Sequence, residues 1–152
     1  LGDVYKRQIC YMPNLDELSL RKIIGLILDF YKDPCGYLED EVENYPEVEE
    51  FVIEGYAVLK GERYKLSETG EQFLHKYIKD ISEKFIQYIR EQNYRLSFPE
   101  IASWFYEEYN LESIEDGEDI ADYICKNLDH YGYAYGIVYN SSEGEVYQFH
   151  VV

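Results

Sequence analysis

Basic residues are scarce in this chain: 14 lysines and arginines stand against 31 aspartates and glutamates, giving a formal net charge of −17. A surface of that sign repels nucleic acids and anionic membranes. Cysteine is scarcer still, with three widely spaced residues and no Cys-x-x-Cys pair. This usage argues against a zinc ribbon and against the disulfide framework of a secreted protein.

Long apolar segments are also missing. The longest run, Ile23 to Leu28, is interrupted by Gly25 and is too short to cross a bilayer. No signal peptide is visible, so we expect a soluble, cytoplasmic protein with no membrane partner. A chain of 152 residues buries roughly 70% of its unfolded surface, so its stability requires neither a metal nor a disulfide. We expect no cofactor.

Residue patterns typical of catalysis or metal binding are absent from the sequence. The three histidines show no metal-ligand spacing, and Cys125 and His130 lie five positions apart, on different sides of a helix. The acidic segment 112–119 lacks the alternating ligands of a calcium loop, and Tyr123 stands where the closing glutamate would be. No glycine-rich phosphate loop occurs. We therefore expect no enzyme, no catalytic residue and no metal site.

Hydrophobic periodicity, capping residues and turn residues predict the elements of the first half. A helix opens with Asn14 as its N-cap and ends at Pro34 and Gly36. Two short helices, a hairpin that turns at Gly61 and a long helix capped by Ser67 follow, over residues 37–54, 56–66 and 67–93. The long helix is apolar over a wide arc, which predicts packing on two sides.

The second half repeats this order of elements. A short strand, a helix, a second helix and two strands are predicted over residues 94–98, 97–109, 120–131, 133–139 and 145–151. We expect an acidic turn around Gly117 between the two helices. No linker separates the halves, so the helix over 67–93 is expected to close the first unit and open the second.

The segment from Glu54 to Leu74 resembles the wing and following helix of bacterial winged-helix regulators. In that pattern a glycine ends the third helix, a short hairpin follows, and a serine or threonine before a glycine caps the next helix. The matching residues here are Gly55, Gly61, Ser67 and Gly70. The resemblance implies a mostly α fold with short β-hairpins, built from tandem winged-helix units over 12–93 and 67–152 that share the helix 67–93.

The resemblance also implies a function, which is transcription regulation by a helix-turn-helix. Its reading helix would be Pro46 to Glu54 and its wing would be Lys60 to Lys65. The first residues carry a different resemblance: Asp3 to Gln8 resembles the in-frame translation of a sequencing adaptor known from metagenomic reads. We expect residues 1–11 to be an adaptor scar and a disordered start.

The charges depart from the winged-helix family. Between Glu39 and Glu54 there are eight acids and no base, and Glu47 and Glu50 are expected to lie with Glu54 on the face opposite the buried one. Such a helix repels phosphates, which supply most nonspecific affinity for DNA. In the second unit, residues 94–152 hold 12 acids and two bases, and the candidate reading helix is expected to expose Glu118 and Asp122.

Tyrosines are the other unusual feature, and five of the 18 surround the C-terminal hairpin: Tyr131, Tyr133, Tyr135, Tyr139 and Tyr147. High β-propensity and cross-strand ring packing account for tyrosines in a hairpin. The alternative is a surface that binds a partner. Because no lysine or arginine adjoins these rings, a protein is a better partner for them than single-stranded nucleic acid.

These observations favour a non-enzymatic, acidic winged-helix module that acts as a regulator or adaptor by protein contact. The partner is expected to be a protein with a basic surface, and the candidate contact residues are Glu47, Glu50, Glu54, Glu118, Asp122, Tyr133, Tyr135 and Tyr147. The first alternative is a DNA-binding transcriptional regulator that uses the wing cations Lys60, Arg63 and Lys65. The second is a DNA mimic whose carboxylates imitate phosphates and occupy a DNA-binding protein. The three hypotheses differ in where charge lies on the folded surface.

Overall fold

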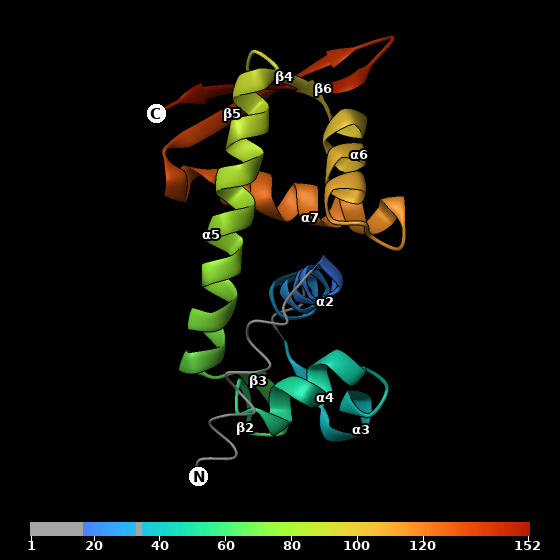
Figure 1. The fold of residues 1–152 in the computed structure, drawn as a ribbon, viewed down its shortest axis with the longest axis vertical. Helices are drawn as coiled ribbons and strands as arrows, with labels where there is room; N and C mark the ends of the chain where they lie inside the picture. Colours follow the sequence, from blue (N-terminus) through green and yellow to red (C-terminus); the bar gives the residue numbers. More distant parts are fainter. Residues whose placement is uncertain (1–16, 33–34) are drawn as a thin grey trace.

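The computed structural model describes residues 17–32 and 35–152 (Figure 1). In these residues six α-helices accompany two three-stranded antiparallel sheets. The mostly helical fold with short hairpins is therefore confirmed. The predicted N-cap Asn14 and the expected adaptor scar over 1–11 lie outside the described residues. None of the described helices has the length and apolar character needed to span a membrane.

The first half is the lower part of the molecule in Figure 1. Its elements are α2 (Glu17–Ile27), the π-helical turn η1 (Leu28–Lys32), β1 (Tyr37–Leu38), α3 (Glu39–Val42), α4 (Pro46–Ile53), β2 (Ala57–Lys60) and β3 (Arg63–Leu66). The strands lie in the order β1-β3-β2. Pro46 occupies the first turn of α4, where its missing N–H is not needed, so the predicted break between α3 and α4 is confirmed.

The second half lies above the first and is joined to it by the long vertical helix α5 (Glu68–Glu91) (Figure 1). The elements that follow are β4 (Arg95–Ser97), α6 (Phe98–Glu108), α7 (Ile114–Lys126), the 3₁₀ turn η2 (Leu128–Tyr131), β5 (Tyr133–Asn140) and β6 (Gly144–Val151). Its strand order is β4-β6-β5. Counting α2 and α5 as the opening helices, both halves have the same order of elements and of strands.

Serine side chains fix where the helices begin. Ser67 Oγ accepts a hydrogen bond from the Gly70 N–H at 3.1 Å and caps α5. Ser97 caps α6, the helix predicted from residue 97, in the same way and forms a capping box with Glu100. Both helix starts are therefore confirmed.

The expectation of an acidic turn around Gly117 is wrong. The helix α7 begins at Ile114, where Ser113 Oγ accepts from the Asp116 N–H at 3.2 Å, and Gly117 lies inside it. Acidic residues in a first turn stabilise a helix N-terminus rather than a turn. A Cβ on Gly117 would lie 2.5 Å from the Ala102 carbonyl oxygen, so glycine is needed here for the close approach of α6 and α7.

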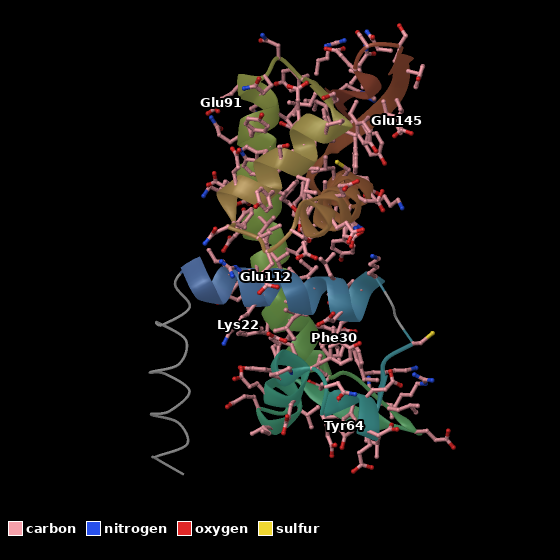
Figure 2. The ribbon with its side chains drawn as sticks, turned by 90° about the vertical axis from the view of Figure 1, so that its right-hand side faces the viewer. Lys22, Phe30, Tyr64, Glu91, Glu112 and Glu145 are labelled. Atoms are coloured by element: carbon pink, nitrogen blue, oxygen red, sulfur yellow. The ribbon has the colours of Figure 1, made fainter. Side chains whose placement is uncertain are left out.

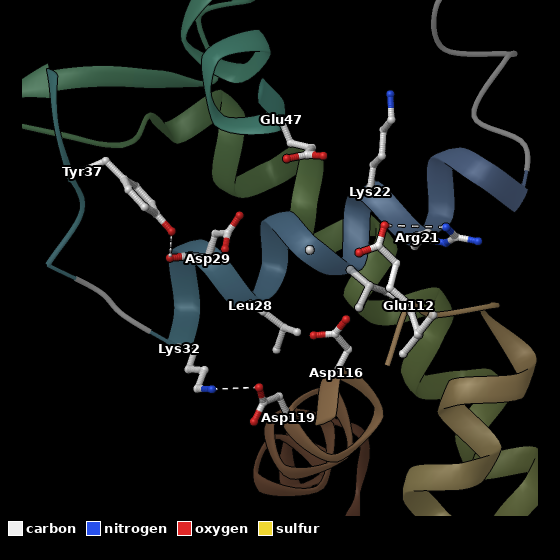
Figure 3. A pocket seen from close by; sticks show the side chains of 13 residues that line it. Arg21, Lys22, Leu28, Asp29, Lys32, Tyr37, Glu47, Glu112, Asp116 and Asp119 are labelled. Atoms are coloured by element: carbon white, nitrogen blue, oxygen red, sulfur yellow. Dashed lines mark hydrogen bonds and ion pairs between the residues drawn. The ribbon is translucent and has the colours of Figure 1, made fainter. Parts of the chain in front are cut away.

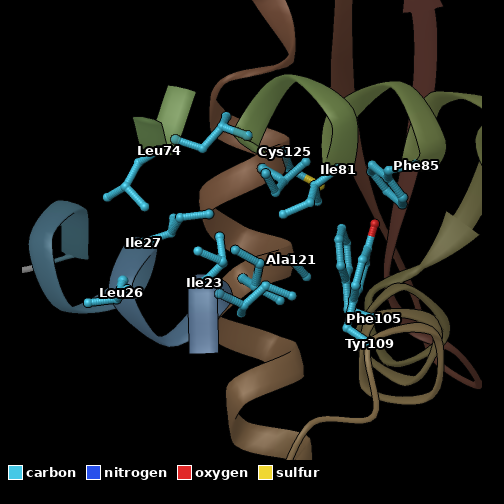
Figure 4. Packing of buried hydrophobic residues seen from close by; sticks show 14 of the residues in the cluster. Ile23, Leu26, Ile27, Leu74, Ile81, Phe85, Phe105, Tyr109, Ala121 and Cys125 are labelled. Atoms are coloured by element: carbon cyan, nitrogen blue, oxygen red, sulfur yellow. The ribbon is translucent and has the colours of Figure 1, made fainter. Parts of the chain in front are cut away.

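One hydrophobic core runs through both halves. Ile23 and Ile27 of α2 belong to it together with Leu74 of α5 and Ala121 and Cys125 of α7 (Figure 4). From the π-helical turn that follows α2, Phe30 points down toward the first half, where it contacts other aromatic rings (Figure 2). The segment formed by α2 and η1 thus contributes to the packing of both halves.

Aromatic rings also connect the two halves. The Tyr31 ring of η1 stacks on the Tyr123 ring of α7 with centroids 5.6 Å apart, and on the His75 ring of α5 with centroids 6.0 Å apart. Burial raises the pKa of the Tyr31 hydroxyl to about 12. The wide apolar arc of the long helix matches its packing on both halves, since α5 contacts α2 and β3 and its Phe85 ring packs on Phe105 of α6.

Candidate functional site

The acidic helix α4 presents a different face from the predicted one. Glu50 is exposed, but Glu47 is half-buried and lines a cleft beside α2, and Glu54 is half-buried just beyond the last residue of the helix. The three glutamates therefore do not share one outward face. The helix α4 packs against α2, and this contact places Glu47 at the edge of the cleft. The exposed side chains of α4 are instead Pro46, Glu49, Glu50 and Ile53, the last with 74% of its surface exposed.

Apolar exposure continues past the end of α4. Val58 and Leu59 of β2 are exposed, and so is Tyr45, which precedes the helix. We call the exposed residues Glu49, Glu50, Ile53, Val58 and Leu59 the α4–β2 surface; Val58 and Leu59 are adjacent in the strand, so their side chains point to opposite faces of the sheet. Sequence reasoning found the acids of this region but missed its apolar members, because a strand with Val and Leu is typical of a buried strand.

The wing cations are largely engaged within the protein. Arg63 donates from Nη1 to the Gly36 carbonyl oxygen at 3.2 Å and lies 3.7 Å from the Glu41 carboxylate. Lys60 lies opposite Arg63 in the register of strands β2 and β3. Its Nζ donates to the Leu66 carbonyl oxygen at 3.1 Å. Lys65 is exposed. A phosphate would have to compete with these internal contacts for two of the three cations.

The acidic candidates of the second half lie on α7. Glu118 is exposed, whereas Asp122 is half-buried and accepts from Lys126 Nζ at 2.8 Å, one helical turn away. A surface pair of this kind contributes little to stability, and a partner can replace it at small cost. Both residues remain accessible, and their contact role stays a prediction.

The tyrosines of the C-terminal hairpin are mostly structural. Tyr133 and Tyr147 are 6% and 5% exposed, so their rings are not the accessible contacts that the sequence suggested. The Tyr133 hydroxyl accepts from Arg90 Nη2 at 2.7 Å, and the Tyr147 ring stacks on Tyr135 with centroids 4.9 Å apart. Tyr133 lies at the start of β5 and Tyr147 lies on β6, the central strand of the sheet, and both rings belong to the hydrophobic core.

Exposed apolar residues of the hairpin lie farther along the strand. Ile137, Val138 and Tyr139 of β5 are all exposed, Tyr139 to 76%. The strand forms one edge of its sheet and carries no charged residue. Such an edge is a place where another chain can pair.

A cleft of about 750 Å³ separates α2 and η1 from α7 (Figure 3). Two ion pairs span it: Lys32 Nζ lies 2.8 Å from the Asp119 carboxylate, and Arg21 Nη1 lies 3.9 Å from the Glu112 carboxylate. Between them, Asp29 lies near Glu47 and Asp116 (Figure 3). The cleft therefore holds like charges at its centre and opposite charges at its ends.

Asp29 has a raised affinity for protons. Burial raises its pKa from 3.8 to about 6, with smaller contributions from the charges of Glu47 and Asp116, while Tyr37 opposes the shift. The Tyr37 hydroxyl donates to the backbone carbonyl of Asp29 at 3.0 Å. Asp29 could not be singled out from the sequence, because the neighbouring carboxylates come from helices 18 and 87 positions away.

The described residues contain no group of three or more histidine, cysteine, aspartate or glutamate side chains that could hold a metal ion. Cys125 is buried, and burial raises the pKa of its thiol, which disfavours the reactive thiolate. The His130 side chain is exposed and lies 4.0 Å from Asp129.

No protein-family model, no curated protein and no solved structure matches this chain significantly. The function proposed below is therefore argued from the charge, exposure and contacts of the described residues alone.

Proposed function

We propose that this chain is a non-enzymatic, acidic regulatory or adaptor module built from two winged-helix units that share α5, and that it acts by binding a protein with a basic surface. The architectural part is supported by the repeated order of elements and by the strand orders β1-β3-β2 and β4-β6-β5. In both halves a short strand after the first helix pairs with the second strand of the hairpin.

One observation carries the functional part. The helix α4, which would be the reading helix of a winged-helix unit, exposes Glu49, Glu50 and the apolar Ile53 and carries no base. A phosphate backbone is repelled by such a surface. A protein interface, in contrast, commonly combines an apolar centre with a charged rim, and the α4–β2 surface has this composition.

Contact with a basic partner also fits the charge of the whole chain. A net charge of −17 accelerates encounter with a positively charged partner and suppresses encounter with nucleic acid. Glu118 and Asp122 of α7 add carboxylates on the second half. We expect these rim charges to act mainly on the association rate.

The test compares capture of a partner by matched variants. Ile53→Ser removes the apolar centre of the α4–β2 surface, and Glu49→Gln with Glu50→Gln removes its charged rim. We expect Ile53→Ser to lower the affinity for the captured protein at least about tenfold, because a central apolar anchor typically contributes more than 1 kcal/mol. The double Gln variant should mainly slow association at low salt.

The matched control is Asp80→Asn with Glu83→Gln, which removes two exposed carboxylates from α5 without altering the α4–β2 surface. Capture should be unchanged in this variant. If the control variant captured the partner as poorly as the Glu49→Gln, Glu50→Gln variant, capture would depend on net charge alone and not on the α4–β2 surface. Binding of duplex DNA with a steep salt dependence, abolished by changing Lys60 and Lys65, would instead support the wing-mediated alternative.

A further inference from the structure

A second hollow, of about 340 Å³, lies between α5 and α6, away from the α4–β2 surface. Its floor is an aromatic pair: the rings of Tyr88 and Trp104 stack with centroids 5.0 Å apart and planes 13° apart. Trp104 also packs on Phe85 and Phe105, so its ring is held in place from the core side. We call this site the Trp104 hollow.

Carboxylates border the aromatic pair. Glu100 and Glu107 line the hollow with Ser103 and Pro99, and positions 100, 103, 104 and 107 share one face of α6. Glu100 is held by hydrogen bonds from the Ser97 N–H at 3.3 Å and the Ser97 hydroxyl at 2.8 Å, both to Oε1. Both of these hydrogen bonds use the same oxygen of the carboxylate. Burial and the charges of Glu100 and Glu107 raise the pKa of the Tyr88 hydroxyl.

Nearby bases are engaged elsewhere. None of the residues that line the hollow is basic. Lys84, one turn before Tyr88, pairs with Glu108 and lies over the Tyr109 ring, 5.8 Å from its centroid. Arg95 of β4 donates to Glu143 at 2.8 Å. Arg95 is also close enough to Glu100 for their charges to interact, but among the described residues no ion pair joins a basic side chain to Glu100 or Glu107.

Aromatic faces next to carboxylates are suited to a guanidinium group. The guanidinium is planar, weakly hydrated and always charged, so it can lie on an aromatic ring and pair with a carboxylate at the same time. An indole is the most favourable ring for such a cation. A lysine ammonium is compact and strongly hydrated, and it gains less from this combination.

We propose that the Trp104 hollow binds an arginine side chain presented by a partner protein, with the guanidinium lying on the Tyr88–Trp104 pair and hydrogen-bonded to Glu100 and Glu107. The proposal rests on the proposed function and adds to it a residue type that the basic partner must present. It also places a contact on the second half, separate from α4.

The single tryptophan of the chain makes this site directly observable. Its indole N–H gives one cross-peak in a nitrogen–proton correlation spectrum, and fluorescence excited beyond the tyrosine band reports on Trp104 alone. The probes are the peptide acetyl-Gly-Arg-Gly-amide and the same peptide with citrulline, which is neutral and nearly isosteric. We expect a saturable shift of the indole cross-peak with the arginine peptide and none with the citrulline peptide.

Two variants of the hollow and one control test the geometry. Glu107→Lys should weaken binding of the arginine peptide at least about tenfold, because a close charge pair is replaced by repulsion. Glu83→Lys makes the same change of charge at an exposed position of α5 that does not line the hollow, and binding should be kept. Ser103→Arg places a guanidinium at the hollow within the chain, so it should alter Trp104 fluorescence and abolish the response to the peptide.

Three results would overturn this proposal: no shift with the arginine peptide, an equal shift with the citrulline peptide, or equal weakening by Glu83→Lys and Glu107→Lys. If the arginine peptide did not bind but Ile53→Ser still abolished capture, arginine binding at the Trp104 hollow would be refuted and the proposed function would remain. Loss of the proposed function would appear as duplex DNA binding or as capture insensitive to Ile53→Ser.

Discussion

Identical side chains differ in role here because of where each lies. Glu50 and Glu100 are both exposed, but Glu100 also accepts hydrogen bonds from Ser97 at the first turn of α6, whereas Glu47 is half-buried and lines the cleft near Asp29. Glu50 and Glu100 have the solvated environment that a charged residue prefers. Asp29 is half-buried, and its pKa is raised chiefly by burial and to a smaller extent by the charges of Glu47 and Asp116.

We predict that Asp29→Asn stabilises the protein at neutral pH and not at low pH. The pKa of Asp29 is about 6 when folded, against 3.8 ordinarily, so the folded state binds the proton more tightly and stability falls as pH rises through this window. Asparagine removes the charge that causes this loss. Because Asp29 is only half-buried, solvent screening reduces the effect, and we expect about 1 kcal/mol above pH 7. Urea unfolding at pH 4 and pH 7.5 measures it.

Asp119→Asn is the matched control in the same cleft. It removes the ion pair with Lys32, so it should be neutral or slightly destabilising at pH 7.5, by at most about 1 kcal/mol. Equal stabilisation by both substitutions would mean that only the net charge of the cleft matters. An Asp29→Asn effect that is the same at both pH values would show that Asp29 is not the titrating group.

The packing of α6 against α7 requires a glycine at position 117. Their backbones approach at Gly117, where a Cβ would lie 2.5 Å from the Ala102 carbonyl oxygen and 3.3 Å from Tyr106 Cβ. Gly70 at the start of α5 makes a similar approach, since its Cβ would lie 2.0 Å from the Tyr56 carbonyl oxygen. In both places a helix lies directly against the backbone of another segment.

We predict that Gly117→Ala destabilises the protein by about 1–3 kcal/mol, because α6 and α7 must move apart to accept the methyl group. The matched substitution is Gly25→Ala in α2, where a new Cβ meets nothing within 4 Å. There, alanine should stabilise by about 0.5–1 kcal/mol, because it restricts the unfolded chain more than glycine does. Urea unfolding measures the change in the free energy of unfolding for both variants. Equal destabilisation by both substitutions would argue against a specific close approach at Gly117.

At the scale of the whole molecule, one core joins two similar halves. The buried cluster includes residues of α2, α4, α5, α6, α7 and the C-terminal hairpin, and ion pairs and stacked rings link η1 to α7. Unfolding of either half would expose apolar surface of the other. Cooperative unfolding of both halves follows from this arrangement.

We predict that Ile27→Ala, a change in the first half, lowers the stability reported by Trp104 in the second half. Ile27 is fully buried, and its truncation should cost about 2–5 kcal/mol. In a single cooperative body, the urea midpoint from Trp104 fluorescence shifts as much as the midpoint from far-ultraviolet circular dichroism. Two separate transitions, with the Trp104 midpoint unchanged, would show instead that the halves unfold independently.

Local sequence patterns determined most of the elements. Capping serines, Pro46 and the glycine turns act through backbone groups only a few residues away, so the helix starts at Ser67 and Ser97, the break before α4 and both hairpins could be predicted. The start of α7 was missed, although Ser113 with Asp116 is a capping signal, because a run of acids resembles a turn.

Tertiary packing decided which side chains are available. Helical spacing placed Glu47 on an outward face, but contact with α2 turned it into the cleft. Hairpin spacing could not tell that Tyr133 and Tyr147 are covered while Ile137 and Tyr139 are exposed, because the core ends partway along β5. Asp29 and the Trp104 hollow depend on residues from separate helices. Such neighbours are fixed by the packing of the whole chain and leave no local periodicity in the sequence.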